Sequence, residues 1–383
     1  MRTSGPGTSP QFNGVPGGLH RYAGHCPYAG STGERMKVSS TTSPGQTVVG
    51  ERQTWIDQAR WIAIVLVVMG HAVGQMRSQS GLAIVISNYV YIFHIPVFVI
   101  LAGWGARRAE ANGKNLAKIW WQLLLPYVIF QIVAFALDWL LDGKDPSWSF
   151  TNQTFGLWFL VALAGWRFLG PWFRGLPWAV PLSVVLALLA GLSPSIGSWL
   201  SISRILFFLP LFVLGPWLVD HVSVWRKIVS LRWAAAAYLV VLAAVVLLLG
   251  KDFWRDPFLG KSSYEDLEQG NLAGMLVRLG VLALAVVTAA AFLLVLPGKP
   301  GAPSVAGGWI AGAGQHTMYP YLLHLQVLTL VGATEWKTLG QPTVTTCLFV
   351  LGAILVCVVA ELKAVRTIFL PLVEPRRLST FFR

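Results

Sequence analysis

Two histidines within long apolar segments are the residues of this chain best suited to chemistry. His71 follows Arg60 by eleven residues in the segment QARWIAIVLVVMGHAVGQM, and His94 lies in the next apolar segment, YIFHIPVFVILAGW. An ionisable side chain inside a membrane is costly and is a functional candidate by default. A neutral imidazole there could act as a general base, because it can accept the proton of an attacking hydroxyl group.

The spacing predicts that the two histidines lie at the same depth. His71 is eleven residues from Arg60, and His94 is eleven residues before Gly105. At the helical rise per residue, both lie about 16 Å from the same membrane surface. We therefore expect the two imidazoles to meet near the middle of two antiparallel helices. The alternative is that each is a polar residue that only hydrogen-bonds a neighbouring helix.

A later segment, GQHTMYPYLLHLQ, adds His316 and His324. Eight residues of helix place them about 80° apart, so both could face one interior. Pro320 between them is expected to bend the helix. Asp57 and Arg60, three residues apart, are predicted to pair. No metal-ligand spacing is present, and no metal is expected.

The composition indicates a protein of the membrane. Hydrophobic residues make up 55% of the 383 residues and charged residues only 12%, about half the share that soluble proteins carry. The formal charge of +13 would suit a nucleic-acid binder. The basic residues, however, cluster between apolar segments, as the positive-inside rule predicts, so membrane lipids are the expected environment and no nucleic acid is an expected partner.

The apolar segments predict an all-α, polytopic bundle of about ten transmembrane helices. We expect them over residues 58–76, 82–105, 116–141, 155–170, 178–193, 202–220, 232–250, 272–296, 308–331 and 343–363. Lys and Arg concentrate in alternate connections, which predicts that both termini are cytoplasmic.

Three regions follow from this pattern. Residues 1–54 are rich in Gly, Ser, Thr and Pro and are predicted to form a disordered cytoplasmic tail. Residues 55–365 form the membrane domain, and residues 366–383 a basic cytoplasmic tail. The cell membrane is the expected location.

The motifs together resemble the acyltransferase-3 family of integral membrane O-acyltransferases, which includes fucose 4-O-acetylase-like proteins. Arg60, ten residues and His71 resemble the family's R-x10-H pattern, and YIFHIPVFVILAGW resembles its second-span motif. GLWFLVAL and GQHTMYPYLLH resemble later motifs, and the resemblance covers residues 55 to about 365. Two positions differ: Ala102 replaces a common Ser, and adjacent Arg107 and Arg108 replace an Arg-x-x-Arg motif.

The resemblance implies transfer of an acyl group, usually acetyl, from cytoplasmic acyl-CoA to a hydroxyl of a sugar, a cell-envelope glycan or a lipid-linked sugar. It implies His71 as the catalytic residue and Arg60 as a helper in donor binding or in the integrity of the site. His94, because of its matched depth, is the expected second member of the site. Arg107 and Arg108 at the cytoplasmic end suit the donor phosphates. Acyl-CoA is a co-substrate, and no bound cofactor is implied.

Other polar residues of the spans have two interpretations. Arg278, His324 and Trp158 are candidates for acceptor binding. Arg204 and Arg278 could bind an anionic group or extend their charges to the membrane surface. The main alternative function is a secondary transporter of a small polar or anionic solute, although the paired broken helices of such proteins are not evident. A non-catalytic scaffold would leave two histidines at matched depth unexplained.

Overall fold

The computed structural model describes residues 54–143, 149–197, 199–296, 308–334, 336 and 340–376. The predicted N-terminal tail and the last residues of the C-terminal tail lie outside these ranges. The described residues form helices and connections and contain no strand, as the all-α prediction requires.

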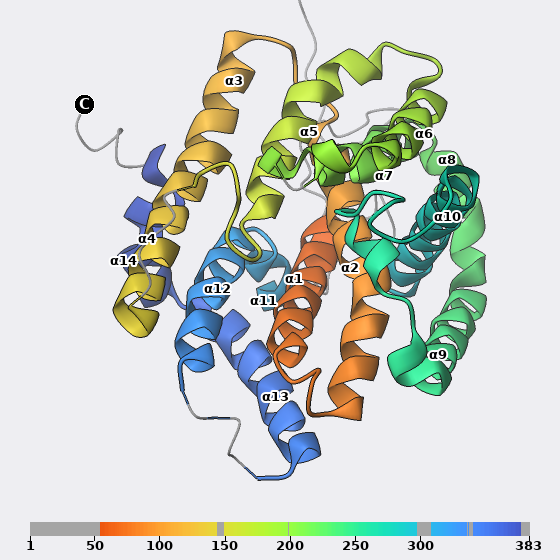
Figure 1. The fold of residues 1–383 in the computed structure, drawn as a ribbon. Coiled ribbons are helices and arrows are strands. Elements are labelled where there is room, and N and C mark those ends of the chain that lie inside the picture. The colour runs from red at the N-terminus through yellow and green to blue at the C-terminus, as the bar shows by residue number, and fades with distance from the viewer. Residues whose placement is uncertain are drawn as a thin grey trace, which may run out of the picture. The chain divides into compact units, whose positions relative to one another are not determined.

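Fourteen α-helices make up the described part of the chain (Figure 1). They are α1 (Thr54–Gly74), α2 (Gly81–Ala106), α3 (Gly113–Ile119), α4 (Leu125–Asp142), α5 (Trp158–Arg174), α6 (Ala179–Leu189), α7 (Ile202–Asp220), α8 (Val222–Ile228), α9 (Arg232–Leu249), α10 (Asn271–Val295), α11 (Gly308–Ala313), α12 (Met318–Gly332), α13 (Pro342–Ala360) and α14 (Lys363–Val373).

Seven of the predicted spans coincide with helices that are long and apolar enough to cross a membrane. Within the described ranges these are Trp55–Gly74, Gly81–Ala106, Gly113–Leu141, Trp199–Asp220, Val229–Asp252, Asn271–Val295 and Pro342–Ala360. The predictions over 155–170 and 178–193 fall on shorter apolar helices, α5 with 17 residues and α6 with its following turn. The fold is therefore a polytopic helical membrane protein.

The single helix predicted over 308–331 is wrong, because the structure divides this segment. α11 ends at Ala313 and α12 begins at Met318, so His316 lies in the connection between them. Gly314 packs directly on the backbone of α1, where an added Cβ would overlap the carbonyl group of Asp57. Pro320 lies in the first turn of α12, where no amide donor is needed, and it therefore does not bend the helix interior.

α2 is the central helix, and it contacts α1, α5, α7, α9, α10 and α13. Its closest partner is α7. Gly103 lies against the backbone of Phe212, and Gly215 lies against the backbone of Ile100, so that a Cβ at either glycine would overlap main-chain atoms. Such small residues let membrane helices approach closely. The pair fixes α2, which carries His94, at the middle of the bundle.

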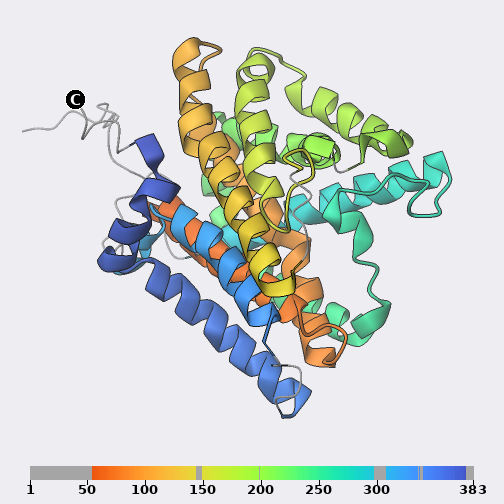
Figure 2. The same cartoon turned by 60° about the vertical axis from the view of Figure 1, so that its left-hand side comes forward.

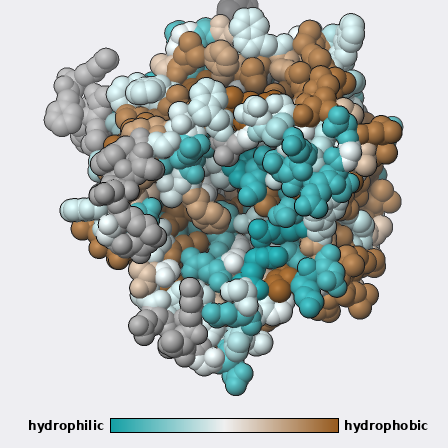
Figure 3. All heavy atoms as spheres, viewed as in Figure 1, coloured by the Kyte–Doolittle hydropathy of each residue, from teal (hydrophilic) through white to brown (hydrophobic). Residues whose placement is uncertain are grey.

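The helices differ in how much surface they bury in the protein. α1 is largely buried, whereas α9 lies at the edge, with exposed apolar side chains at Val240, Leu247 and Leu248. Side chains of this kind suit contact with lipid. Figure 3 shows hydrophilic side chains gathered near the middle of one face, with hydrophobic side chains around them.

The C-terminal helices α12, α13 and α14 pack on one another, and α12 and α14 also contact α4. α12 lies between α4 and α13 in both views of the ribbon, and α14 packs on α4, α12 and α13 (Figures 1 and 2). The boundary predicted at residue 365 falls inside α14. α12 is thereby held beside α1, so that side chains of these two helices come into contact.

Candidate functional site

A cavity of about 780 Å³ lies between the N-terminal and C-terminal helices. Its wall includes Arg60 and His71 from α1, Ala102 from α2, Trp158 and Arg167 from α5, and residues 314–319 between α11 and α12. Arg376 and Glu374 also line it. Arg60 and His71 therefore share one cavity, and they lie about three turns apart along α1.

His71 is held by a second imidazole. Its Nδ1 lies 3.0 Å from Nε2 of His324 on α12, and the two rings are stacked with centroids 5.2 Å apart. His324 is fully buried, and its Nδ1 lies 2.8 Å from the carbonyl oxygen of Pro320. His71 thus begins a chain of two hydrogen bonds that ends on the backbone of α12.

The partners in this chain assign the tautomers of both rings when they are neutral. The Pro320 carbonyl can only accept, so the proton of His324 is on Nδ1 and its Nε2 accepts. His71 must then donate from Nδ1, which leaves the lone pair on its Nε2. No described residue hydrogen-bonds this Nε2. His71 therefore lines the cavity and carries an unprotonated nitrogen, Nε2.

The predicted proximity of His71 and His94 is confirmed, since their ring centroids are 6.4 Å apart and the rings are edge to face. His94 is 1% exposed and does not line the cavity. Its Nδ1 donates to the carbonyl of Val90 at 2.7 Å, and its Nε2 has no hydrogen-bond partner among the described residues. His94 is thus a neighbour of His71, while His324 is its hydrogen-bond partner.

The helix that precedes α4 is widened where it borders the cavity. Residues Trp120–Leu124 form a π-helical turn just before Pro126, which has no amide hydrogen to continue the α-helical pattern. Trp121, Gln122 and Leu123 from this turn line the cavity. Gln122 accepts a hydrogen bond from Arg167 at 3.2 Å, so the turn positions one of the cavity's cations.

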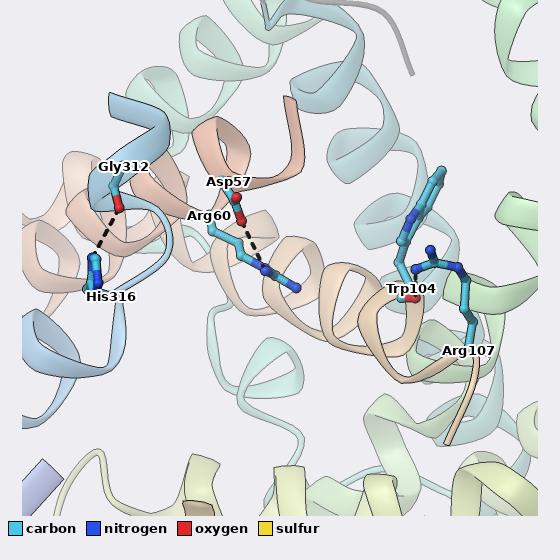
Figure 4. Close-up of polar contacts among 6 residues, drawn as sticks. All are labelled: Asp57, Arg60, Trp104, Arg107, Gly312 and His316. Carbon is cyan, nitrogen blue, oxygen red and sulfur yellow. Dashed lines mark hydrogen bonds and ion pairs between the residues drawn. The ribbon is translucent and has the colours of Figure 1, made fainter. Parts of the chain in front are cut away.

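The ion pair predicted between Asp57 and Arg60 is confirmed, with Nη1 of Arg60 3.2 Å from Oδ1 of Asp57 (Figure 4). His316, which lines the same cavity, donates from Nδ1 to the carbonyl of Gly312 and lies 3.6 Å from the carboxylate of Glu361. Figure 4 shows Arg60 on α1 and His316 on the connection that follows α11, and α1 and α11 pack against each other.

Arg107 and Arg108 lie near the same end of the bundle but outside the cavity wall. Arg107 donates to the carbonyl of Trp104 at 3.1 Å, so its side chain folds back on α2 (Figure 4). Burial and the neighbouring Arg108 lower the pKa of Arg107. The structure brings Arg167 and Arg376 into the wall instead.

The two remaining candidates for acceptor binding, Trp158 and Arg278, lie in different parts of the structure. Trp158 lines the cavity, with the guanidinium of Arg204 4.5 Å above its ring. Arg278 is buried elsewhere, and it donates to the carbonyls of Ala187 at 2.9 Å and Ser262 at 2.7 Å. These bonds fix the connection before α10 to α6.

Sequence reasoning placed Arg60 and His71 together but missed Gln122, Arg167 and the bond to His324. Pro126 within an apolar segment was the available signal for the widened turn.

A comparison with protein families identifies the family of this chain. The model of the acyltransferase domain family, acyltransferase type 3, matches residues 53–362, which include α1 to α13 almost entirely. No curated protein and no solved structure matches the chain. Because the family match covers most of the chain, the protein belongs to the acyltransferase-3 family and is a membrane acyltransferase.

Proposed function

We propose that this acyltransferase takes an acyl group, with acetyl as the expected group, from acyl-CoA on the cytoplasmic side. The acceptor is a hydroxyl of a sugar or of a cell-envelope glycan. The Arg60 end of the bundle is the cytoplasmic end in this proposal, and the membrane is the cell membrane. His71 is the catalytic base, and His324 is its positioning residue.

The observation that carries the proposal is the hydrogen-bond chain from His71 through His324 to Pro320. A general base needs an unprotonated nitrogen within reach of the hydroxyl group. The chain keeps the proton of His71 on Nδ1 and leaves Nε2 to accept. His71 also lines the cavity, so that nitrogen belongs to a residue that substrate can reach.

The reaction then proceeds by direct attack. Nε2 of His71 removes the proton from the acceptor hydroxyl while its oxygen bonds to the thioester carbonyl carbon. The tetrahedral intermediate collapses, the carbon–sulfur bond breaks, and the imidazolium returns the proton to the CoA thiolate. A covalent acyl-histidine is the alternative route, because imidazole is also a nucleophile.

The cavity suits the donor in size and in charge. Its volume of about 780 Å³ falls within the usual range for small-molecule sites. Arg60, Arg167 and Arg376 line it, and arginine forks bind phosphate groups well. The charged nucleotide of CoA would stay at this end, while the narrow pantetheine arm extends toward His71.

The test uses purified protein in detergent with acetyl-CoA labelled on the acetyl group and an extract of envelope lipids and glycans. We expect label in the extract and an equal release of free CoA thiol. The same protein in sealed vesicles provides the contrast, since accumulation of an unmodified solute without thiol release would support a transporter and contradict this function.

A further inference from the structure

A second group of arginines lies on the other side of His71 from Arg60. Arg255, in the connection between α9 and α10, places its guanidinium 4.7 Å above the ring of Tyr91 on α2. The charges of Arg77 and Arg204 also act on Tyr91. The Tyr91 ring in turn lies 6.4 Å from the ring of His71 and 4.8 Å from that of His94.

These cations have no acidic partner. Among the residues that the structure describes, Arg77, Arg204 and Arg255 form no ion pair. Arg77 donates to Ser87 and to Asn88, the latter at 2.7 Å. Burial and the charge of Arg255 lower the pKa of Arg77, and Asp256 offsets this only in part. A partly buried cation without a counter-ion is costly, so the group is one that an anion would stabilise.

The arginines are held by aromatic faces, and this leaves donors unused. Arg204 lies 4.5 Å above Trp158, and the one hydrogen bond of its side chain within the described ranges runs from Nε to the carbonyl of Leu259. The side chain of Arg255 makes no hydrogen bond to a described residue. A cation over a ring face keeps the N–H groups at its edge available.

His71 is also close to an exposed side chain that lies outside the cavity wall. The ring of Phe155 lies 4.8 Å from the ring of His71, yet Phe155 is 62% exposed and does not belong to the cavity wall. One side chain therefore separates His71 from a second accessible surface. The donor cavity occupies the Arg60 side, so this surface is the free approach for a second substrate.

The imidazoles fit the polar part of such a substrate. His94 is buried, and its Nε2 is an acceptor without a partner. The Nε2 of His71 is an acceptor as well, with the ring centroids 6.4 Å apart. Hydroxyl groups of a sugar could donate to these two acceptors, and an unmatched buried acceptor costs about 1–3 kcal/mol.

We propose that the acceptor is a sugar that carries a phosphate or carboxylate group, bound by Arg204 and Arg255 with a hydroxyl at His71. This inference rests on the proposed function. Arg77, fixed by Ser87 and Asn88, supports the same positive potential from the end of α1. Tyr91 adjoins both ends of this site, since the guanidinium of Arg255 lies 4.7 Å from its ring and the ring of His71 lies 6.4 Å from it.

The test compares glucose 1-phosphate, glucuronate and glucose as probes of the purified protein. Their binding is measured at low salt in detergent, and acetylation is measured separately with labelled acetyl-CoA. We expect both anionic sugars to bind about 10-fold or more tightly than glucose, as hydrogen bonds to charged groups allow. Preference for only one anion supports the proposal and identifies the group.

Arg255→Gln should lose most of this preference, and Arg255→Lys should keep part of it. Lys251→Gln, which removes an exposed charge from the same connection, is the matched control and should keep the preference. Equal binding of the three sugars to the unaltered protein, or an unchanged preference in Arg255→Gln, would overturn the proposal. Anion preference without acetylation would instead contradict the proposed function alone.

Discussion

The two groups of arginines on either side of His71 are held in different ways. At the donor cavity, Arg60 pairs with Asp57 at 3.2 Å and Arg167 bonds to Gln122 at 3.2 Å. On the Tyr91 side, Arg204 and Arg255 lie over aromatic rings and have no acidic partner within the described ranges. Polar side chains hold Arg60 and Arg167, whereas among the described residues of the Tyr91 side only Arg77 is held in this way, by Ser87 and Asn88.

The difference affects how strongly each group of arginines can bind an anion. A cation that already has an ion pair loses part of that interaction when it binds a phosphate. Each contact on the donor side therefore contributes less binding free energy, but the empty site is more stable. A cation on an aromatic ring keeps its hydrogen-bond donors free. In our proposals the donor side is a preformed chamber, and the Tyr91 side is a small site whose charge an anionic ligand would balance.

The largest expected effect is on neither group, because both sides depend on His71. His71→Ala should lower the rate of acyl transfer by about 10² to 10⁴, the usual contribution of a general base. Binding of acetyl-CoA and of the anionic sugars should change little, because the arginines remain. Single-turnover transfer and equilibrium binding, measured on the same preparation, separate the two effects.

His324 provides the control for this prediction. His324→Gln offers an amide oxygen to Nδ1 of His71, whereas His324→Leu removes the acceptor and leaves a buried donor unmatched. The first should retain more activity than the second, by roughly 10-fold for each 1.4 kcal/mol of the lost bond. Near-normal transfer by His71→Ala would show that another residue is the base.

A smaller effect is expected at the donor side. Arg60→Ala should weaken acetyl-CoA binding by about 10-fold, within the range for a charged hydrogen bond, and leave sugar binding unchanged. Arg60→Lys keeps the charge but loses the planar fork, so its effect should be smaller. Isothermal titration with acetyl-CoA measures both. Equal donor affinity in all three proteins would remove Arg60 from donor binding.

Much of the fold follows from sequence patterns, because hydrophobic length and charge asymmetry determine where a chain crosses a membrane. α1 and α2 were predicted closely, and with them the proximity of His71 and His94. The break between α11 and α12 was not predicted, because it depends on the contact of Gly314 with the Asp57 backbone. Such a contact joins residues far apart in sequence and leaves no local periodicity.

The site divides in the same way. Arg60 and His71 lie on one helix, so their relation follows from helical geometry. The partner of His71 is on α12, 253 residues away, and no spacing rule selects His324 over His94. Arg167 enters the cavity with the help of a π-helical turn that depends on Pro126. These relations required the three-dimensional arrangement.

The smallest effect concerns a buried acid that lies beside His316 of the donor side. Glu361 follows the end of α13, is 8% exposed and lies 3.6 Å from His316. Burial raises the pKa of its carboxyl group from 4.5 to about 7, although Arg366 on α14 acts in the opposite direction. His316, Arg366 and Cys357 are the titratable groups that act on it.

The sign of its effect on stability follows from proton binding. Below pH 4.5 the carboxyl is protonated in the folded and the unfolded protein, so it contributes no pH dependence. Between pH 4.5 and about 7 only the unfolded state releases the proton, and stability falls as the pH rises. Above about pH 7 both states are ionised and the decrease ends.

Glu361→Gln removes this pH dependence. The melting temperature of the variant, relative to that of the unaltered protein, should therefore rise from pH 5 to 7, and the difference between the two should stay constant at higher pH. Glu374→Gln, which removes an acid from the cavity wall near His316, is the matched control. Melting curves that run parallel over the whole range for Glu361→Gln would contradict the raised pKa of Glu361.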